Sequence, residues 1–446
     1  MTAMPRLLEC LKNPQFARLY LAQTINLVGD AFTWLGLALL AFEVGGGKAA
    51  AILSGALTLR VMAFAILSPV AGAIADRCDR KQMMILTHIL RAIAVCLFPF
   101  VTQIWHIYAL VLALNVVGAF FTPTYTATIP FVTGKDDYPN AIALSSTTYQ
   151  LLGVLGPGLA GSVAAFVGTR SVFFIDGLTF LSAAFLLLTL PGKLAVIQPQ
   201  DERRTIGKMF KDLGLGTNCL FSDPPIRYAL FVQLVAAISG AQILVNTVSY
   251  VRGTLNLGKV EYGWVMAAFG IGATIASVGL GNLDRSYRKT KFVGIGIILL
   301  TLALLPANVA NLGGLLVLWA IAGIGQTLVN LPTQTLIADR VAVEIQGRVY
   351  GAHFAWSHLW WAFSYPLAGW MGSHFPAQSF FYSSLISAVL LILVRFAFNP
   401  TRGRMANNGL WHEHEHIHDE HHAHHRSTNG TIPTHRHLHF HPELTS

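Results

Sequence analysis

The chain has 446 residues, of which 54% are hydrophobic and 11% charged, and its mean hydropathy is +0.55. Average soluble domains are about 25% charged, so this composition excludes a soluble enzyme. The net charge of +9 does not indicate nucleic-acid binding, because the basic residues fall in alternate loops, as they do on the cytoplasmic face of membrane proteins.

Apolar runs long enough to cross a bilayer, which takes about 20 residues, recur along the whole chain. They predict an all-α membrane protein of twelve transmembrane helices, at approximately 16–42, 49–74, 82–101, 105–130, 138–167, 171–190, 226–250, 261–282, 291–309, 312–338, 347–373 and 378–397. The distribution of basic loops places both termini in the cytoplasm of a cell whose inner (plasma) membrane holds the protein.

One long polar connection within the helical body divides the spans six and six. We expect an N-terminal half at 1–192, a cytoplasmic linker at 193–225, a C-terminal half at 226–398 and a disordered, histidine-rich cytoplasmic tail at 399–446.

The two halves share short motifs in one register. Asp76-Arg77-x-x-Arg80-Lys81 recurs as Asp284-Arg285-x-x-Arg288-Lys289, and Pro123-Thr124-x-Thr126 recurs as Pro332-Thr333-x-Thr335, at offsets of 208 and 209 residues. Matching offsets indicate a duplicated six-helix unit, the organisation of transporters whose substrate site lies between two halves.

The segment from Gly72 to Lys81 fits the pattern Gly-x-x-x-Asp-Arg-x-x-Arg-Arg/Lys, and at these residues the sequence resembles the major facilitator superfamily. The resemblance implies a transporter fold without enzymatic activity. It also implies that acidic and basic residues of this loop pair across the two halves while the cytoplasmic side is shut, which gives the gating candidates Gly72, Asp76, Arg77, Arg80, Lys81, Asp284 and Arg285. Alternatively, these charges only set the topology.

A run of small residues, Gly153-x-x-Gly156-Pro157-Gly158-x-x-Gly161, lies in the fifth predicted helix. It resembles the glycine-proline signature of exporters in this superfamily. Ordinary close packing of helices is the alternative explanation.

Polar residues three or four positions apart share one face of the first, fourth, seventh and tenth predicted helices, the four that surround the central cavity in this superfamily. Polar side chains are costly in lipid, so such faces are expected to turn toward a cavity. With Arg91 of the third span, the candidates for the cavity and proton coupling are Gln23, Asn26, Asp30, Asn115, Gln242, Asn246, Gln326 and Asn330.

Asp30 stands out as an acid near the centre of a span, which makes it a candidate proton carrier or cation ligand. His88 and Arg91, one helical turn apart, are candidate counter-ions for it. The alternative is a neutral, hydrogen-bonded carboxyl group that only fixes helix packing. Asp176, near one end of the sixth span, is interpreted as a helix cap.

The tail contains twelve of the 17 histidines. They are His412, His414, His416, His418, His421, His422, His424, His425, His435, His437, His439 and His441. Neutral imidazole suits nickel, copper, zinc and cobalt, and interleaved acidic residues add oxygen ligands, so the tail is predicted to bind metal. An expression tag and a pH-responsive solvated tail are the alternatives.

The start Asn13-Pro-Gln-Phe-Ala-Arg-Leu, the Gly29-Asp30 pair, Gln346-Gly-Arg-Val and the tail together resemble the nickel-resistance permeases of this superfamily. The resemblance implies proton-driven export of nickel or another divalent metal such as cobalt, as substrate and not as cofactor, with no nucleotide involved. One alternative is a proton-coupled exporter of an organic molecule, a siderophore or drug, with an accessory tail. A metal-storage or sensing protein is another.

Overall fold

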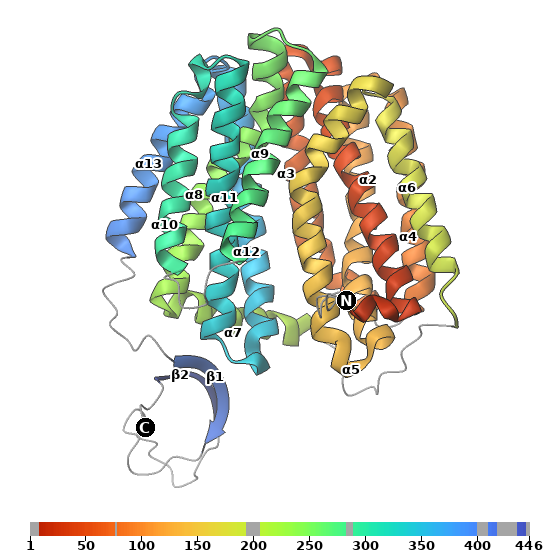
Figure 1. The fold of residues 1–446 in the computed structure, drawn as a ribbon. Helices are drawn as coiled ribbons and strands as arrows, with labels where there is room; N and C mark the ends of the chain where they lie inside the picture. Colours follow the sequence, from red (N-terminus) through yellow and green to blue (C-terminus); the bar gives the residue numbers. More distant parts are fainter. Residues whose placement is uncertain are drawn as a thin grey trace, which may run out of the picture.

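The computed structural model describes residues 9–75, 78–192, 206–281, 289–398, 409–416 and 435–442, which form a helical bundle followed by a two-stranded ribbon (Figure 1). The first half comprises α2 (Pro14–Gly45), α3 (Ala49–Ala75), α4 (Arg80–Leu97), α5 (Ile104–Val167) and α6 (Ser171–Leu188). The second half comprises α8 (Pro224–Ser249), α9 (Lys259–Gly281), α10 (Lys289–Leu304), α11 (Leu312–Arg340), α12 (Val343–His374) and α13 (Ser379–Ala397). Short 3-10 or π turns lie at Cys10–Lys12, Gly46–Lys48, Phe98–Phe100, Tyr250–Thr254 and Ala307–Val309.

Local sequence explains several helix starts. Asn13 precedes Pro14, and its side chain accepts hydrogen bonds from the first free backbone N–H groups of α2. Asp79 and Asp223 cap α4 and α8 in the same way. The long α5 contains a break at Gly134, whose φ of 73° and ψ of 179° are not helical. The predicted spans 105–130 and 138–167 lie on either side of this break.

By length and hydropathy, nine stretches among the described residues qualify to cross a membrane. Their outer surfaces carry large exposed apolar side chains, including Leu178, Phe185, Ile275 and Leu302. Such a surface is unfavourable in water and suits lipid. The chain is therefore a multi-pass membrane protein whose membrane-spanning part is all-helical, and the number of twelve spans stays a prediction.

Two polar segments contain secondary structure that was not predicted. Within the predicted linker, α7 (Ile206–Ser222) is a helix that packs on α12, where Trp356 Nε1 donates to Thr217 Oγ1 at 3.2 Å. Gly216 permits this approach, since a Cβ there would collide with the backbone oxygen of Arg348.

The tail is also not wholly disordered. Strands β1 (Gly409–His416) and β2 (His435–Pro442) pair antiparallel, and β1 contacts α11 and α12. The sequence of both strands alternates histidine with other residues, and a period of two is the pattern of a strand. The prediction of disorder overlooked this period.

We call the end of the bundle where α2 begins the N end, and the opposite end, where α2 stops at Gly45, the far end. Figure 1 shows the ribbon of β1 and β2 beyond the N end.

Candidate transport cavity

A cavity of about 280 Å³ lies between the two halves. Its lining is mostly apolar and aromatic, with one acid and one base. The lining residues are Leu27, Asp30, Ala31, Trp34, Leu35, Ala38, Leu53, Leu57, Arg60, Tyr149, Leu152, Gly153, Leu244, Tyr262, Met266 and Tyr365. The guanidinium of Arg60 lies over the Trp34 ring, 4.0 Å from its centroid, so the base is held against the cavity wall.

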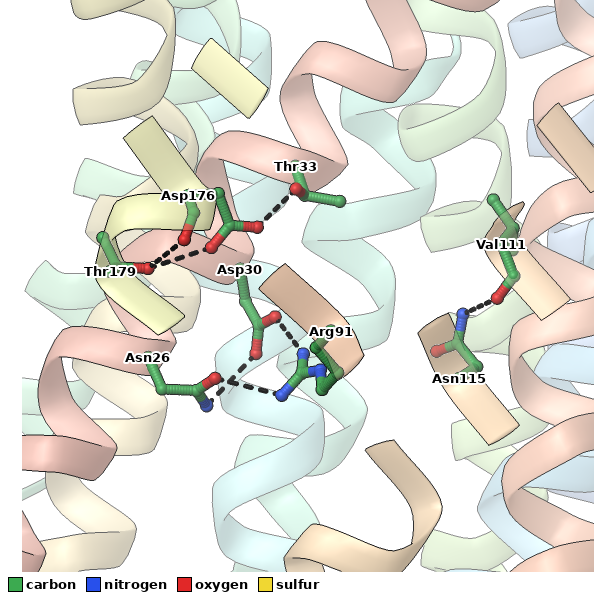
Figure 2. A network of polar contacts seen from close by, with 8 residues as sticks. All are labelled: Asn26, Asp30, Thr33, Arg91, Val111, Asn115, Asp176 and Thr179. Carbon is green, nitrogen blue, oxygen red and sulfur yellow. Dashed lines mark hydrogen bonds and ion pairs between the residues drawn. The ribbon is translucent and has the colours of Figure 1, made fainter. Parts of the chain in front are cut away.

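Asp30 connects this cavity to a buried polar group that we call the Asp30 cluster, formed by Asn26, Asp30 and Arg91 (Figure 2). Arg91 Nη2 pairs with Asp30 Oδ1 at 2.5 Å, and its Nη1 donates to Asn26 Oδ1 at 3.0 Å. The expected counter-ion pair between Arg91 and Asp30 is therefore present. Asp30 keeps 24% of its side chain exposed, so the carboxylate faces the cavity while its counter-ion lies behind it.

Asp176 on α6 lies beside this cluster and was misinterpreted from the sequence. It is not a cap, because Arg170 occupies the N-cap position of α6 and Asp176 is completely buried. Thr33 Oγ1 donates to Asp176 Oδ2 across the contact between α2 and α6. The signal that could have identified it is an acid inside an apolar run, with Thr179 one turn later on the same face.

His88, the other expected counter-ion, does not pair with Asp30. Its ring lies between the rings of Phe121 and Phe180, with centroids 4.5 Å and 5.8 Å away. Within the part of the chain that the structure describes, neither ring nitrogen has a hydrogen-bond partner.

The other predicted cavity residues are distributed around the bundle and do not line this cavity. Asn115 donates from Nδ2 to the backbone oxygen of Val111 at 2.7 Å, one turn earlier on its own helix (Figure 2). Gln23 Oε1 and Gln326 Oε1 are buried without a partner among the described residues, and Asn330 Oδ1 accepts from Gln233 Nε2 at 3.4 Å.

Gln242 and Asn246 on α8 are buried against α12. Asn246 Nδ2 donates to Gln242 Oε1 and, at 3.0 Å, to the backbone oxygen of Ala368. Gln242 Nε2 lies 3.1 Å from the sulfur of Met371. The polar stripe predicted on this helix therefore packs within the second half in the observed conformation.

Of the predicted gating residues, the structure describes the side-chain contacts of Arg80 and Lys81. Arg80 Nη1 donates to the backbone oxygen of Ala127 at 2.8 Å, and Lys81 Nζ donates to those of Leu188 and Leu190 at 2.9 Å and 2.6 Å. These contacts stay within the first half. Gly72 belongs to α3. Asp76, Arg77, Asp284 and Arg285 lie outside the described residues.

At the far end the two halves touch directly. Glu43 of the first half pairs with Lys259 of the second at 2.9 Å, and with Arg170 at 3.7 Å. Nearby, α5 and α9 approach backbone to backbone at Gly161 and Gly263, where a Cβ on either glycine would collide with the other. The far end is therefore closed by contacts between the halves.

The predicted metal ligands divide between the ribbon and undescribed residues. His412, His414 and His416 are in β1, and the strand β2 contains His435, His437, His439 and His441. The remaining five, His418, His421, His422, His424 and His425, lie outside the described residues. Among the side chains that the structure describes, no group of three or more histidine, cysteine, aspartate or glutamate residues is placed to hold a metal ion.

Residues 19–252 and 229–432 each match the sequence profile of the Major Facilitator Superfamily, so the profile fits the chain twice, once for each half. The chain belongs to this superfamily. Members of the major facilitator superfamily are transporters and not enzymes, so the cavity between the halves is a candidate for the passage of a small substrate.

Curated relatives cover most of the helical body. The chain is 27% identical over 346 residues to the "Uncharacterized MFS-type transporter YfiS" of Bacillus subtilis, covering 74% of this chain and 80% of that protein. It is 29% identical to the "Multidrug resistance protein MdtG" of Dickeya zeae, over 64% of this chain and 69% of the relative. The "Multidrug efflux pump Tap" of Mycolicibacterium fortuitum is 24% identical, over 77% and 85% of the two chains.

Solved structures share the fold at low identity. A bacterial homologue of the human lysosomal transporter Spinster, in an inward-facing and unoccupied conformation, has a TM-score of 0.68 at 15% identity, and the match covers 90% of this chain and 98% of that protein. The nucleoside transporter NupG has a TM-score of 0.68 at 14% identity, with coverages of 86% and 99%. At such identities the likeness concerns the fold alone.

Proposed function

We propose that this protein exports divalent transition-metal cations, nickel or cobalt, from the cytoplasm by proton antiport and thereby confers metal resistance. It acts in the inner (plasma) membrane with both termini in the cytoplasm. The observation that carries the proposal is the register of the histidine ribbon, defined as β1 and β2: His412 stands opposite His439, His414 opposite His437, and His416 opposite His435.

This register favours metal capture for a geometric reason. Residues two apart in a strand share one face, and directly opposite residues of an antiparallel pair are close neighbours. The six histidine positions of the three cross-strand pairs therefore fall on one face of the ribbon. Imidazole nitrogens at such spacing suit nickel, copper, zinc and cobalt, and histidines in the segment that joins the strands would add ligands.

Topology supports the direction of transport. The ribbon contacts α11 and α12 and extends beyond the N end, while the far end is closed by Glu43, Lys259 and the glycine contact. A metal collector on the cytoplasmic side suits an exporter, which must gather dilute ions from inside. An importer would benefit from a collector outside.

The Asp30 cluster provides a means of coupling. A cation that enters the cavity meets the exposed side of the Asp30 carboxylate, and it competes there with Arg91. Because Asp30 can bind either a proton or a cation, binding of one disfavours the other, which is the requirement for antiport. Gln23, Asn115, Gln242, Asn246, Gln326 and Asn330 are proposed to contribute in other conformations of the cycle, as are the loop residues of the gate.

The test is metal uptake by inverted vesicles under an imposed pH gradient, with nickel and cobalt compared with drugs. The intact protein should accumulate nickel, Asp30→Asn should lose pH-driven accumulation, and truncation after Arg404 should weaken transport only at low metal. Wild-type rates in Asp30→Asn, or complete loss in the truncation at saturating metal, would contradict this assignment of roles.

A second candidate is export of an organic molecule with the tail as an accessory. Two observations favour this candidate. The cavity wall consists mainly of Leu, Tyr, Trp and Met side chains, and two of the similar proteins are named as a multidrug resistance protein and a multidrug efflux pump. Apolar and aromatic walls with few polar groups are typical of sites for small organic ligands. Vesicles that accumulate a drug but not nickel would establish this function and exclude metal export.

A further inference from the structure

Asp176 lies between α2 and α6, with the hydroxyl groups of Thr33 and Thr179 beside its carboxyl group (Figure 2). Its carboxyl group accepts from Thr33 on α2, and Thr179 of its own helix lies beside it. Gly29 makes room, because a Cβ there would collide with Thr179 Oγ1 and Asp176 Oδ1. The absence of a side chain at Gly29 thus brings this carboxyl within reach of the Asp30 cluster.

Among the residues that the structure describes, no cation forms an ion pair with Asp176. Within the described part of the chain, its hydrogen-bond partners are hydroxyl groups, and Arg91 uses both Nη atoms for Asn26 and Asp30. The other titratable or charged groups near it are Asp30 on α2, and Arg91 and Cys96 on α4. His88 on α4 contacts the Phe180 ring one turn along α6. A fully buried carboxylate without a cation is strongly disfavoured, whereas a neutral carboxyl group is not.

The hydrogen-bond count agrees with a neutral carboxyl. Thr179 Oγ1 lies 2.8 Å from the backbone oxygen of Asp176 and 3.0 Å from its Oδ1. A hydroxyl group carries one hydrogen, so it can donate fully to only one of these acceptors. If Oδ1 carries a proton, the carboxyl donates to the hydroxyl oxygen, the hydroxyl donates to the backbone, and both contacts are satisfied.

We propose that Asp176 is a second proton-binding residue of the transport cycle, and that Arg91 alternates between Asp30 and Asp176. In the observed state Arg91 neutralises Asp30 while Asp176 holds a proton. When a cationic substrate takes the Asp30 carboxylate, Arg91 is released and pairs with Asp176, whose proton departs to water in the cavity. This coupling step rests on the proton antiport proposed above.

The position of Arg91 suits such a movement. Its guanidinium lies over the ring of Phe180, 4.2 Å from the centroid and one turn from Asp176 on α6. Its Nε is buried and has no acceptor among the described residues, so the side chain has a donor to offer. In the proposed exchange, rotation about the terminal bonds of Arg91 carries its guanidinium from Asp30 toward Asp176.

Infrared spectroscopy of the purified protein in lipid tests the proton without needing transport. The intact protein at pH 7 should show a protonated carboxyl C=O band that Asp176→Asn removes. Asp30→Asn should weaken the band, because Arg91 is then free to pair with Asp176. Asn keeps both a donor and an acceptor, so folding should persist. Thr33→Val, which removes only the donated hydrogen bond, should shift the band to higher frequency and provides a second variant if Asp176→Asn does not fold. An intact protein without the band, or a band unchanged in both Asp176→Asn and Thr33→Val, would overturn the inference.

Nickel chloride then tests the alternation. Its addition should weaken the band in the intact protein and release protons to the medium, and Asp176→Asn should release fewer while still binding nickel. Nickel that releases the same number of protons from both proteins would refute the role of Asp176 in coupling. Failure of the intact protein to bind or transport nickel would instead refute the proposed substrate, and the infrared band would be unaffected by that result.

Discussion

Replacement of Gly263 by alanine should open the far end of the transporter. An ideal Cβ at this position would lie 2.7 Å from Gly161 Cα and 3.0 Å from its carbonyl carbon. Ordinary van der Waals contact begins at 3.4 Å, so α5 and α9 must separate by about 0.7 Å at this point. Both partners are backbone atoms of helices and cannot rotate away as a flexible side chain would.

Overpacking of this kind costs about 1–3 kcal/mol. The cost falls on the state in which the far ends touch, so it shifts the equilibrium between conformations by about 5- to 150-fold toward a far-end-open state. Gly161→Ala should act in the same direction. Gly279→Ala is the matched control, because it gives the same gain in helix propensity on α9 but its Cβ meets nothing within 4 Å.

Spin labels provide the assay. With the four native cysteines replaced by serine, labels at Gly47→Cys and Thr254→Cys report the separation of the halves, because both positions are exposed at the far end. The long-distance population should grow in Gly263→Ala and Gly161→Ala but not in Gly279→Ala. Identical distance distributions in all three variants would refute the argument that these glycines hold the halves together.

Three further predictions use ion pairs of known burial. Glu43→Gln should shift the conformational equilibrium reported by the same spin labels by less, about 0.2–1 kcal/mol, because the pair of Glu43 with Lys259 is partly exposed. Exchange of the two residues should restore the original distance distribution. Arg91→Lys should reduce pH-driven nickel uptake by roughly tenfold or more, since hydrogen bonds to charged groups contribute about 1.5–3 kcal/mol and an ammonium lacks the guanidinium fork; unchanged uptake would contradict this. Asp223→Ala should cost about 3–5 kcal/mol, because Asp223 is 1% exposed and pairs with Arg340 at 2.7 Å; a melting temperature in detergent equal to that of the intact protein would exclude this role.

The helical body could be predicted because the signals for it are local. Apolar runs identify helices, and residues such as Asn13 and Asp79 mark where they start. The duplication was also visible, since the motif offsets of 208 and 209 residues agree with a superfamily profile that fits the chain twice. The helix α7 and the histidine ribbon were missed because polar composition was given more weight than periodicity.

The candidate site was predicted less completely, because a helical stripe shows which residues share a face but not which neighbour that face meets. Asp30 and Arg91 pair as expected. Gln242 and Asn246 share a face equally well, yet that face meets α12. Asp176 could not be placed from the sequence, because its surroundings come from α2, and only the glycine at position 29 hints at close approach there.

The two halves have unequal roles, and their duplicated origin makes the inequality informative. In the first half, α2 presents Asp30 to the cavity and α4 supplies Arg91. At the duplication offset of 208 residues, Ile238 is the equivalent of Asp30 and Leu299 is the equivalent of Arg91. In the second half, Ser239 instead bonds to Ser387 on α13 at 2.9 Å and is fully buried.

At these matched positions charge is therefore confined to the first half, while the corresponding helix of the second half packs on its neighbours. A proton or cation bound by Asp30 changes the charge of the first half alone. The surfaces that the halves share include the cavity wall at Tyr262 and Met266 and the glycine contact at Gly263 on α9, and the contact of α3 with α12, where a Cβ at Gly369 would collide with Ser54. We infer that the second half responds through these surfaces. Since α9 contributes to both the cavity and the far-end closure, we infer that it is one element through which occupancy of the cavity changes the far-end closure.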